Sequence, residues 1–348
     1  MAACLRTVAR TSSASSPSVV PVANKPILFY GIESIRDAGI TDIGIVVGDT
    51  HQEIRDAVGD GSKFGVKITY IRQEAPLGLA HAVLVSEPFL KDSPFVMYLG
   101  DNLVRDGIGA LAEEFRRDRP NSQILLAHVK NPQDFGVAEL DGERVVRLEE
   151  KPARPKTDLA LVGVYMFDAK VFEAVRAIKP SRRGELEITD AIQYLIDRKY
   201  DVRSHVIAGW WKDTGKLEDM LEANRMMLEN LQPRNEGTLD AESRLEGRVV
   251  VGRGTRIERS VLRGPLILGE RCVVRDAFIG PFTSISDDCV VDSSEIEHSI
   301  VLERSRIERL SARVEGSLVG RDVEIRASGA RPRSYRFMIG DSCAVEVV

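Results

Sequence analysis

The sequence predicts an α/β protein: a Rossmann-like domain on a mostly parallel sheet, followed by a left-handed parallel β-helix of hexapeptide repeats. Strand-like and helix-like segments alternate from residue 20 to about residue 230. This alternation is typical of a parallel sheet with helices on both faces. From Leu245 onward, short apolar units such as "VVVGRGTRI" and "LILGERCVV" recur about every six residues. That repeat is typical of a β-helix.

In the α/β part, apolar runs bounded by glycine or proline predict strands, and segments with helical apolar spacing predict helices. Ligands of open parallel sheets bind at the carboxyl ends of the strands. Asp101 lies at such an end, directly after the run "FVMYLG". The expected strands are 40–48, 66–73, 94–102 and 122–130, and the expected helices are 49–61, 78–90, 107–120 and 215–232.

The repeats after Leu245 predict several stacked coils, because one coil cannot bury its apolar face alone. Ordinary antiparallel strands are the alternative, and the number of repeats favours the β-helix. The segment 328–337, "SGARPRSYRF", is predicted to be a loop that leaves the last coil. Hexapeptide-repeat acyltransferases also carry such coils, but they need a base, usually His, at the coil surface. His298 is the only histidine in the coils, and an acyltransferase would leave the α/β domain unexplained.

Composition limits the partners and the compartment. The 348 residues carry a net charge of -5 and are 43% hydrophobic, which is ordinary for a chain with two folded domains. The negative charge argues against nucleic acid as a partner. No apolar stretch reaches the roughly 20 residues of a membrane span. The four cysteines form no CxxC pair, so neither disulfides nor a zinc site are expected and a cytoplasmic location fits.

Changes in composition predict three segments: 1–18, 19–232 and 240–348. The second holds the α/β alternation and the third holds the repeats. The first is rich in Ser and Thr and has no acidic residue. We expect it to be disordered or to be a misassigned start, and an organelle transit peptide of similar composition is the alternative.

Two aspartates are candidates for a metal site. Asp101 follows a predicted strand, and Asp213 stands shortly before the long predicted helix. Mg²⁺ prefers oxygen ligands and is commonly bound through one or two carboxylates. Either aspartate alone would more commonly cap a helix, so the interpretation as a magnesium site depends on the pair.

Other residues at predicted strand ends suit a phosphorylated ligand. Gln73 can pair with the edge of a base, and Gly78 allows a close backbone approach before a helix. Glu150 can accept sugar hydroxyls beside Lys151, whose cation can meet phosphate, and this pair suits a sugar phosphate. Gly163 interrupts a β-rich run, which indicates either a close approach by a ligand or a bulge.

Seven stretches occur in this order along the chain: "PVANKPILFYGIESIRDAGI", "PLGLAHAV", "LGDN", "EEKP", "VGVYMFD", "RGELEITD" and "WWKDTG". With this combination, the chain resembles the glucose-1-phosphate thymidylyltransferases, in the longer form with a C-terminal β-helix found in antibiotic deoxysugar pathways. The resemblance covers about residues 19–348. It implies an α/β nucleotidyltransferase domain and an enzyme that transfers dTMP from dTTP to glucose 1-phosphate, giving dTDP-glucose and pyrophosphate.

The resemblance also implies roles for the matching residues. Asp101 and Asp213 would hold Mg²⁺, and Gln73 would read the thymine with Gly78 beneath it. The pocket for glucose and its phosphate would be lined by Gly136, Glu150, Lys151 and Gly163, with Arg183 nearby. The two aspartates, Lys151 and Arg183 are the candidate catalytic residues. Transfer of this kind needs positioning and charge neutralisation, with no covalent enzyme nucleophile.

One part of the family pattern is not matched. The family has a first buried strand, a loop of the form LAGGxGTRLRP that wraps the triphosphate, and a lysine shortly before "PVxxKP". Nothing in residues 1–18 matches this loop, and Pro17 stands where the lysine is expected. The sequence therefore predicts that the first strand and the triphosphate loop are missing, which would lower both stability and activity.

Two other functions stay open. The unmatched loop favours a non-catalytic sugar-nucleotide-binding subunit, whereas the retained Asp101 and Asp213 oppose it. A UTP-dependent uridylyltransferase would differ by a single oxygen or methyl contact. The expected small-molecule partners are dTTP and glucose 1-phosphate. A homo-oligomer is also expected, because the β-helices of such enzymes often pack between subunits.

Overall fold

The computed structural model describes residues 1–6, 19–49, 51–142, 144–329 and 344–346. The described chain forms two compact units. The first unit contains 1–6, Val19 and 27–213, and the second contains 20–26 and the residues from Thr214 onward. The predicted boundary between 232 and 240 therefore falls inside the second unit.

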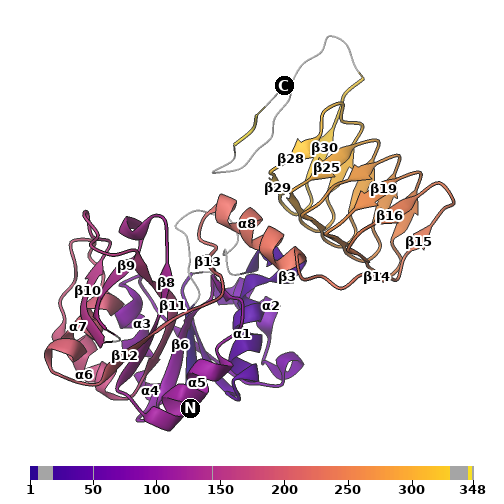
Figure 1. The fold of residues 1–348 in the computed structure, drawn as a ribbon. Helices are drawn as coiled ribbons and strands as arrows, with labels where there is room; N and C mark the ends of the chain where they lie inside the picture. The colour runs from indigo at the N-terminus through magenta and orange to yellow at the C-terminus, as the bar shows by residue number, and fades with distance from the viewer. Residues whose placement is uncertain (7–18, 50, 143, 330–343, 347–348) are drawn as a thin grey trace. The chain divides into compact units, whose positions relative to one another are not determined.

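The first unit is built on a mixed sheet (Figure 1). Its described strands run in the order β5-β4-β1-β6-β11-β8-β12-β10-β9. The strands β5, β4, β1 and β6 are parallel, whereas β11 runs antiparallel between β6 and β8. The bounds are β1 Ala2–Arg6, β4 Asp42–Val47, β5 Lys67–Arg72, β6 Phe95–Leu99, β8 Ser122–His128, β9 Gly136–Asp141, β10 Arg144–Glu150, β11 Leu159–Phe167 and β12 Val202–Val206.

Helices cover both faces of this sheet, as predicted from the alternation of elements (Figure 1). One buried apolar cluster joins α1, α2 and α5 to one face, and a second joins α3, α6 and α7 to the other. The bounds are α1 Ile27–Asp37, α2 His51–Val58, α3 Leu79–Val85, α4 Glu87–Leu90, α5 Gly109–Asp118, α6 Lys170–Ala177 and α7 Ile188–Asp197, with single 3₁₀ turns at Ser62–Phe64 and Pro132–Asp134.

The helix predicted over 78–90 is two helices. The chain leaves α3 at Ser86, whose hydroxyl donates to the carbonyl of Ala82 at 2.8 Å. Pro88 then begins α4, where its missing N–H costs nothing because the first turn of a helix has no intrahelical acceptor for it. Within the described ranges, no helix combines the length and apolarity that a membrane crossing needs.

The prediction that the first strand is missing is wrong. Strand β1 lies between β4 and β6, with Ala3 opposite both Ile43 and Val96. The segment "AACLR" has little of the β-branched character that marks a strand by sequence. Its conformation is set by backbone hydrogen bonds to the two neighbouring strands, which a local pattern cannot reveal. The triphosphate loop was also predicted to be missing. The segment where the family has this loop falls in 7–18, outside the described residues.

The second unit contains the predicted stacked coils. Parallel strands form three sheets along the stack, in the orders β14-β17-β20-β23-β26-β29, β15-β18-β21-β24-β27-β30 and β16-β19-β22-β25-β28. Val249 pairs with Leu266 and Leu266 with Thr283, a spacing of 17 residues, or about three hexapeptides per coil. A row of aliphatic side chains fills the interior: Val251, Leu268, Ile285, Val301 and Val319.

The repeats are therefore confirmed as a β-solenoid. The expected loop 328–337 lies largely outside the described residues. The strands are β14 Arg234–Asn235, β15 Thr238–Leu239, β16 Arg244–Glu246, β17 Val249–Val251, β18 Arg256–Glu258, β19 Val261–Arg263, β20 Leu266–Leu268, β21 Val273–Arg275, β22 Phe278–Ile279, β23 Thr283–Ile285, β24 Val290–Asp292, β25 Glu295–Glu297, β26 Ile300–Val301, β27 Arg306–Glu308, β28 Val314–Glu315, β29 Leu318–Val319 and β30 Glu324–Arg326.

A short hairpin and the long helix belong to this second unit. The hairpin consists of β2 (Pro21–Val22) and β3 (Lys25–Pro26), and the helix is α8 (Leu217–Leu228). Asn224 of α8 is fully buried and joins three segments. Its Oδ1 accepts from the Ala23 N–H at 2.8 Å and the Ser284 hydroxyl at 2.6 Å, and its Nδ2 donates to the Phe282 carbonyl at 3.0 Å. The hairpin is thus held to α8 and to one coil.

Candidate active site

The two predicted metal ligands lie at the ends of two paired segments, Asp101 directly before β7 (Asn102–Val104) and Asp213 at the end of β13 (Trp211–Asp213). Asp101 follows β6, and β7 pairs antiparallel with β13. In this register Asp213 is opposite Asn102. Asp101 is only 6% exposed. The structure therefore brings these carboxylates together from positions more than a hundred residues apart.

Asn102 is a site residue that sequence reasoning missed. Its Nδ2 donates to Asp101 Oδ1 at 2.8 Å, and its Oδ1 accepts from the backbone N–H of Gly163 at 3.1 Å and from Trp211 Nε1 at 2.5 Å. The side chain is buried. Asn102 thus connects the carboxylate of Asp101 to β11 and to β13, the strand that ends in Asp213. Its position in "LGDN" beside Asp101 was the available signal.

The bulge expected at Gly163 is present. The register of β11 against β8 shifts between Leu161 and Tyr165. A Cβ at Gly163 would stand 2.6 Å from Asn102 Oδ1, so any larger residue would push Asn102 away. The close approach at this glycine is therefore to a protein side chain.

The predicted sugar-phosphate residues form a second group. Glu150 and Gly136 are paired across β10 and β9. Glu150 Oε1 accepts from Arg183 Nη1 at 3.3 Å, and Oε2 accepts from the Thr189 hydroxyl at 3.3 Å. A Cβ at Gly136 would stand 2.6 Å from Thr189 Cγ2 and 3.1 Å from Glu150 Oε2. The structure thus brings Gly136, Glu150 and Arg183 together. Lys151 is exposed, and its N–H donates to the Phe135 carbonyl at 3.0 Å.

The pKa of the Glu150 carboxyl is raised, although two cations lie near it. Burial raises the pKa of the Glu150 carboxyl, and the neighbouring carboxylate of Glu187 raises it further. Lys151 and Arg183 act in the opposite direction but do not reverse the shift. A half-buried carboxylate that is held to donors is suited to accept hydrogen bonds from a bound hydroxyl group.

Tyr165 is affected by carboxylates of both groups, the metal candidates Asp101 and Asp213 and the sugar candidate Glu150. Burial raises the pKa of the Tyr165 phenol, and the carboxylates of Glu150, Asp213 and Asp101 raise it further, in that order. All three carboxylates are therefore close enough to act on this buried side chain of β11. The aromatic ring of Trp211 also meets that of Phe135 edge to face, with centroids 5.3 Å apart. This ring contact joins the segment just before Gly136 to the strand that ends in Asp213.

The predicted base-reading residues lie beside α3. Gln73 is 7% exposed, and its Nε2 donates to the Gly78 carbonyl at 3.2 Å. The same nitrogen lies 2.9 Å from Nδ1 of His81, a contact that sequence reasoning missed. Gly78 has a φ of +102°, and a Cβ there would stand 2.4 Å from the carbonyl oxygen of Leu186. Gly78 is therefore needed for the contact between its segment and "RGELEITD".

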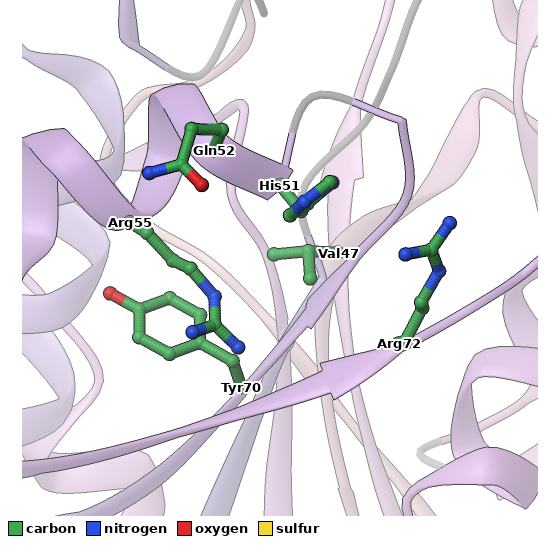
Figure 2. Close-up of a pocket in the computed structure, with 6 residues that line it drawn as sticks. All are labelled: Val47, His51, Gln52, Arg55, Tyr70 and Arg72. Atoms are coloured by element: carbon green, nitrogen blue, oxygen red, sulfur yellow. The ribbon is translucent and has the colours of Figure 1, made fainter.

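A separate cavity of about 230 Å³ lies at the carboxyl ends of β4 and β5, beside the first turn of α2 (Figure 2). The guanidinium of Arg55 lies over the Tyr70 ring, 4.6 Å from its centroid. Arg72 and Gln73 are consecutive at the end of β5, so their side chains point to opposite faces of the sheet. None of the predicted site residues is among its described lining residues, which are Val47, His51, Gln52, Arg55, Tyr70 and Arg72.

The donor set at Asp101 and Asp213 fits Mg²⁺. Within the described part of the chain, no cluster of three or more His, Cys, Asp or Glu side chains is arranged to hold a metal ion. Mg²⁺ keeps several waters and commonly takes only one or two carboxylates together with substrate phosphates. A carboxylate pair without further protein ligands is therefore sufficient for Mg²⁺ in the presence of a nucleotide.

Comparisons with known proteins show that the chain is similar to nucleotidyltransferases over most of its length. A model of the nucleotidyl transferase family matches residues 10–230. A glucose-1-phosphate thymidylyltransferase of Streptomyces antibioticus is 55% identical over 345 residues, which are 99% of this chain and 96% of the relative. Its namesake from Streptomyces griseus is 52% identical over 344 residues, with the same coverage. The low-salt glycan biosynthesis nucleotidyltransferase Agl11 of Haloferax volcanii is 42% identical, covering 94% of this chain and 93% of its own.

Two solved structures share the fold. A Bacillus anthracis protein crystallised with sucrose has a TM-score of 0.61 and 30% identity, covering 67% of this chain and 97% of its own. A UDP-glucose pyrophosphorylase complexed with UDP-glucose has a TM-score of 0.59 and 22% identity, covering 66% and 99%. The Streptomyces relatives align over almost all of this chain. The comparisons therefore do not bear out the expectation of low activity from its first residues.

Proposed function

We propose that this chain, which belongs to the nucleotidyl transferase family, transfers dTMP from dTTP to glucose 1-phosphate. An oxygen of the sugar phosphate would attack the α-phosphorus of dTTP, the bond between the α- and β-phosphates would break, and pyrophosphate would leave. The observation that carries the proposal is the pairing of β7 with β13, which puts Asp213 opposite Asn102, whose side chain is hydrogen-bonded to Asp101. The names of the Streptomyces relatives supply the substrates.

Different residues of the chain would bind the metal ion, the sugar phosphate and the base. Asp101 and Asp213 would hold Mg²⁺, which when bound neutralises charge on the phosphates. Glu150 would accept hydrogen bonds from glucose hydroxyls, and Lys151 and Arg183 would meet its phosphate. The amide of Gln73 would read the base, with Gly78 beneath it. The carboxylates, Lys151 and Arg183 would hold the reacting groups in line, and such positioning is the main contribution of a protein to this chemistry.

The test is release of pyrophosphate from dTTP in the presence of glucose 1-phosphate and Mg²⁺. We expect turnover with dTTP that requires the sugar phosphate, since water should not replace it. UTP in place of dTTP separates thymidylyl from uridylyl transfer. Absence of turnover with either nucleotide would leave the non-catalytic binding subunit as the better function, and binding of dTDP-glucose would then be measured by calorimetry.

A further inference from the structure

We propose that Glu187 is a positioning residue that couples the sugar-phosphate subsite to the nucleotide subsite. The inference rests on the proposed function, because it takes Arg183 and Glu150 as ligands of the sugar phosphate and Gln73 and Gly78 as neighbours of the base. Glu187 is 4% exposed and stands directly before α7. Its side chain contacts the turn that carries Arg183, in the sugar-phosphate subsite. The backbone of the preceding residue, Leu186, is hydrogen-bonded to the segment around Gly78, in the nucleotide subsite.

The side chain of Glu187 holds the turn that carries Arg183. Its Oε1 accepts from the Ser181 hydroxyl at 2.7 Å and lies 3.6 Å from Arg183 Nη1. The same Ser181 oxygen accepts the N–H of Arg183 at 3.1 Å. The turn is closed by the Ser181 N–H, which donates to the Glu185 carbonyl at 2.8 Å. Glu187 therefore fixes both the backbone and the guanidinium of Arg183, the cation expected to meet the phosphate.

The backbone beside Glu187 holds the nucleotide side. The Leu186 N–H donates to the Leu77 carbonyl at 2.8 Å, and the Leu186 carbonyl accepts from the Ala80 N–H at 3.0 Å. These two bonds flank Gly78, whose missing side chain allows the approach. The carbonyl of Gly78 in turn accepts from Gln73. A displacement at Glu187 would therefore reach Gln73 through two hydrogen-bonded segments.

The charge of Glu187 also acts on Glu150. The groups that face Glu150 are Glu187, Lys151 and Arg183, with the hydroxyl of Thr189. Glu187 raises the pKa of Glu150, and the two cations lower it. Glu150 must be ionised to accept hydroxyl groups of the sugar with both oxygens. Affinity for glucose 1-phosphate should therefore fall as the pH drops through the pKa of Glu150.

The test compares Glu187→Gln with Glu185→Gln. Both changes remove a carboxylate from Arg183, since Glu185 Oε1 accepts from its Nη2 at 3.1 Å. Of the two side chains, it is that of Glu187 that accepts from the Ser181 hydroxyl and acts on the pKa of Glu150. We call the fall of glucose 1-phosphate affinity on acidification the acid limb. In Glu187→Gln we expect this acid limb to move to lower pH by roughly half a unit or more. We also expect the KM of this variant for glucose 1-phosphate to rise about tenfold. Its KM for dTTP should rise as well.

In Glu185→Gln the acid limb and the KM for dTTP should stay at their wild-type values. Thermal unfolding identifies any variant that has lost its fold, and Glu187→Asp, which keeps the charge, should keep the acid limb. The inference is overturned if Glu187→Gln leaves the acid limb in place, or if its KM for dTTP matches that of Glu185→Gln. A wild-type chain without turnover would instead overturn the proposed function.

Discussion

Asn102→Ala should destabilise the first unit strongly. The change removes the acceptor of two N–H groups, those of Gly163 and Trp211, and one donor to Asp101. A buried polar group left without a partner costs about 1–3 kcal/mol, so the three losses amount to roughly 3–9 kcal/mol. Total stabilities of about 5–15 kcal/mol are usual. The variant should therefore unfold at a much lower urea concentration.

Urea denaturation followed by tryptophan fluorescence measures this effect. The chain has two tryptophans, Trp210 and Trp211, and both lie in the first unit. Their emission therefore reports that unit without a contribution from the coils. Asn131→Ala is the matched control, because the Nδ2 of Asn131 donates to Asp134 in an exposed hydrogen bond of 2.6 Å. If Asn102→Ala unfolds within about 0.5 kcal/mol of the wild type, the usual range of surface changes, the assigned role of Asn102 is refuted.

Three further outcomes are expected. EDTA should abolish pyrophosphate release, and Asp213→Asn should reduce it by roughly two orders of magnitude or more; full activity in EDTA would contradict the metal assignment. Glu150→Ala should weaken binding of glucose 1-phosphate more than that of dTTP in calorimetry, because a buried partner of the sugar is lost, and equal losses would count against it. Asn224→Ala should lower the stability of the second unit by about 3–9 kcal/mol, since three polar groups lose their partner. Scanning calorimetry should show no such change for the exposed Asn230→Ala.

The elements with a strong periodic pattern could be predicted from the sequence. The coils repeat the same apolar spacing many times, and the central strands are long apolar runs, so local pattern and tertiary environment agree. Strand β1 could not be predicted, because its conformation depends on pairing with β4 and β6 rather than on its own residues. The hairpin and α8, which fall in the predicted segment 19–232, group with the second unit through contacts that are distant in the sequence. Asn224 of α8 is 60 positions from its partner Ser284, and Ala23 of the hairpin is 201 positions from Asn224.

The candidate site shows the same division. Asp101 and Asp213 were expected to act together, and the register of β7 and β13 makes them neighbours. Asn102 and Glu187 were not expected, because neither residue type is marked by periodicity or by a turn. Their roles depend on groups that only the fold brings near: Gly163 is 61 positions from Asn102, and Trp211 is 109 positions from it. A sequence can indicate which charged residues bind a ligand. It rarely indicates which other residues hold those charged side chains in position.

The glycines of the site explain why its geometry depends so closely on protein contacts. Gly78 was expected to allow a close backbone approach, Gly136 to line the sugar pocket, and Gly163 to admit a ligand or mark a bulge. A Cβ at each of these positions would collide with protein at 2.4–2.6 Å. The groups they admit are the backbone of Leu186, the side chain of Thr189 and the amide of Asn102. Each of these groups, or the residue beside it, holds a predicted ligand in place. Replacing any of the three glycines by alanine would therefore displace a predicted ligand indirectly, through the protein group that the glycine admits.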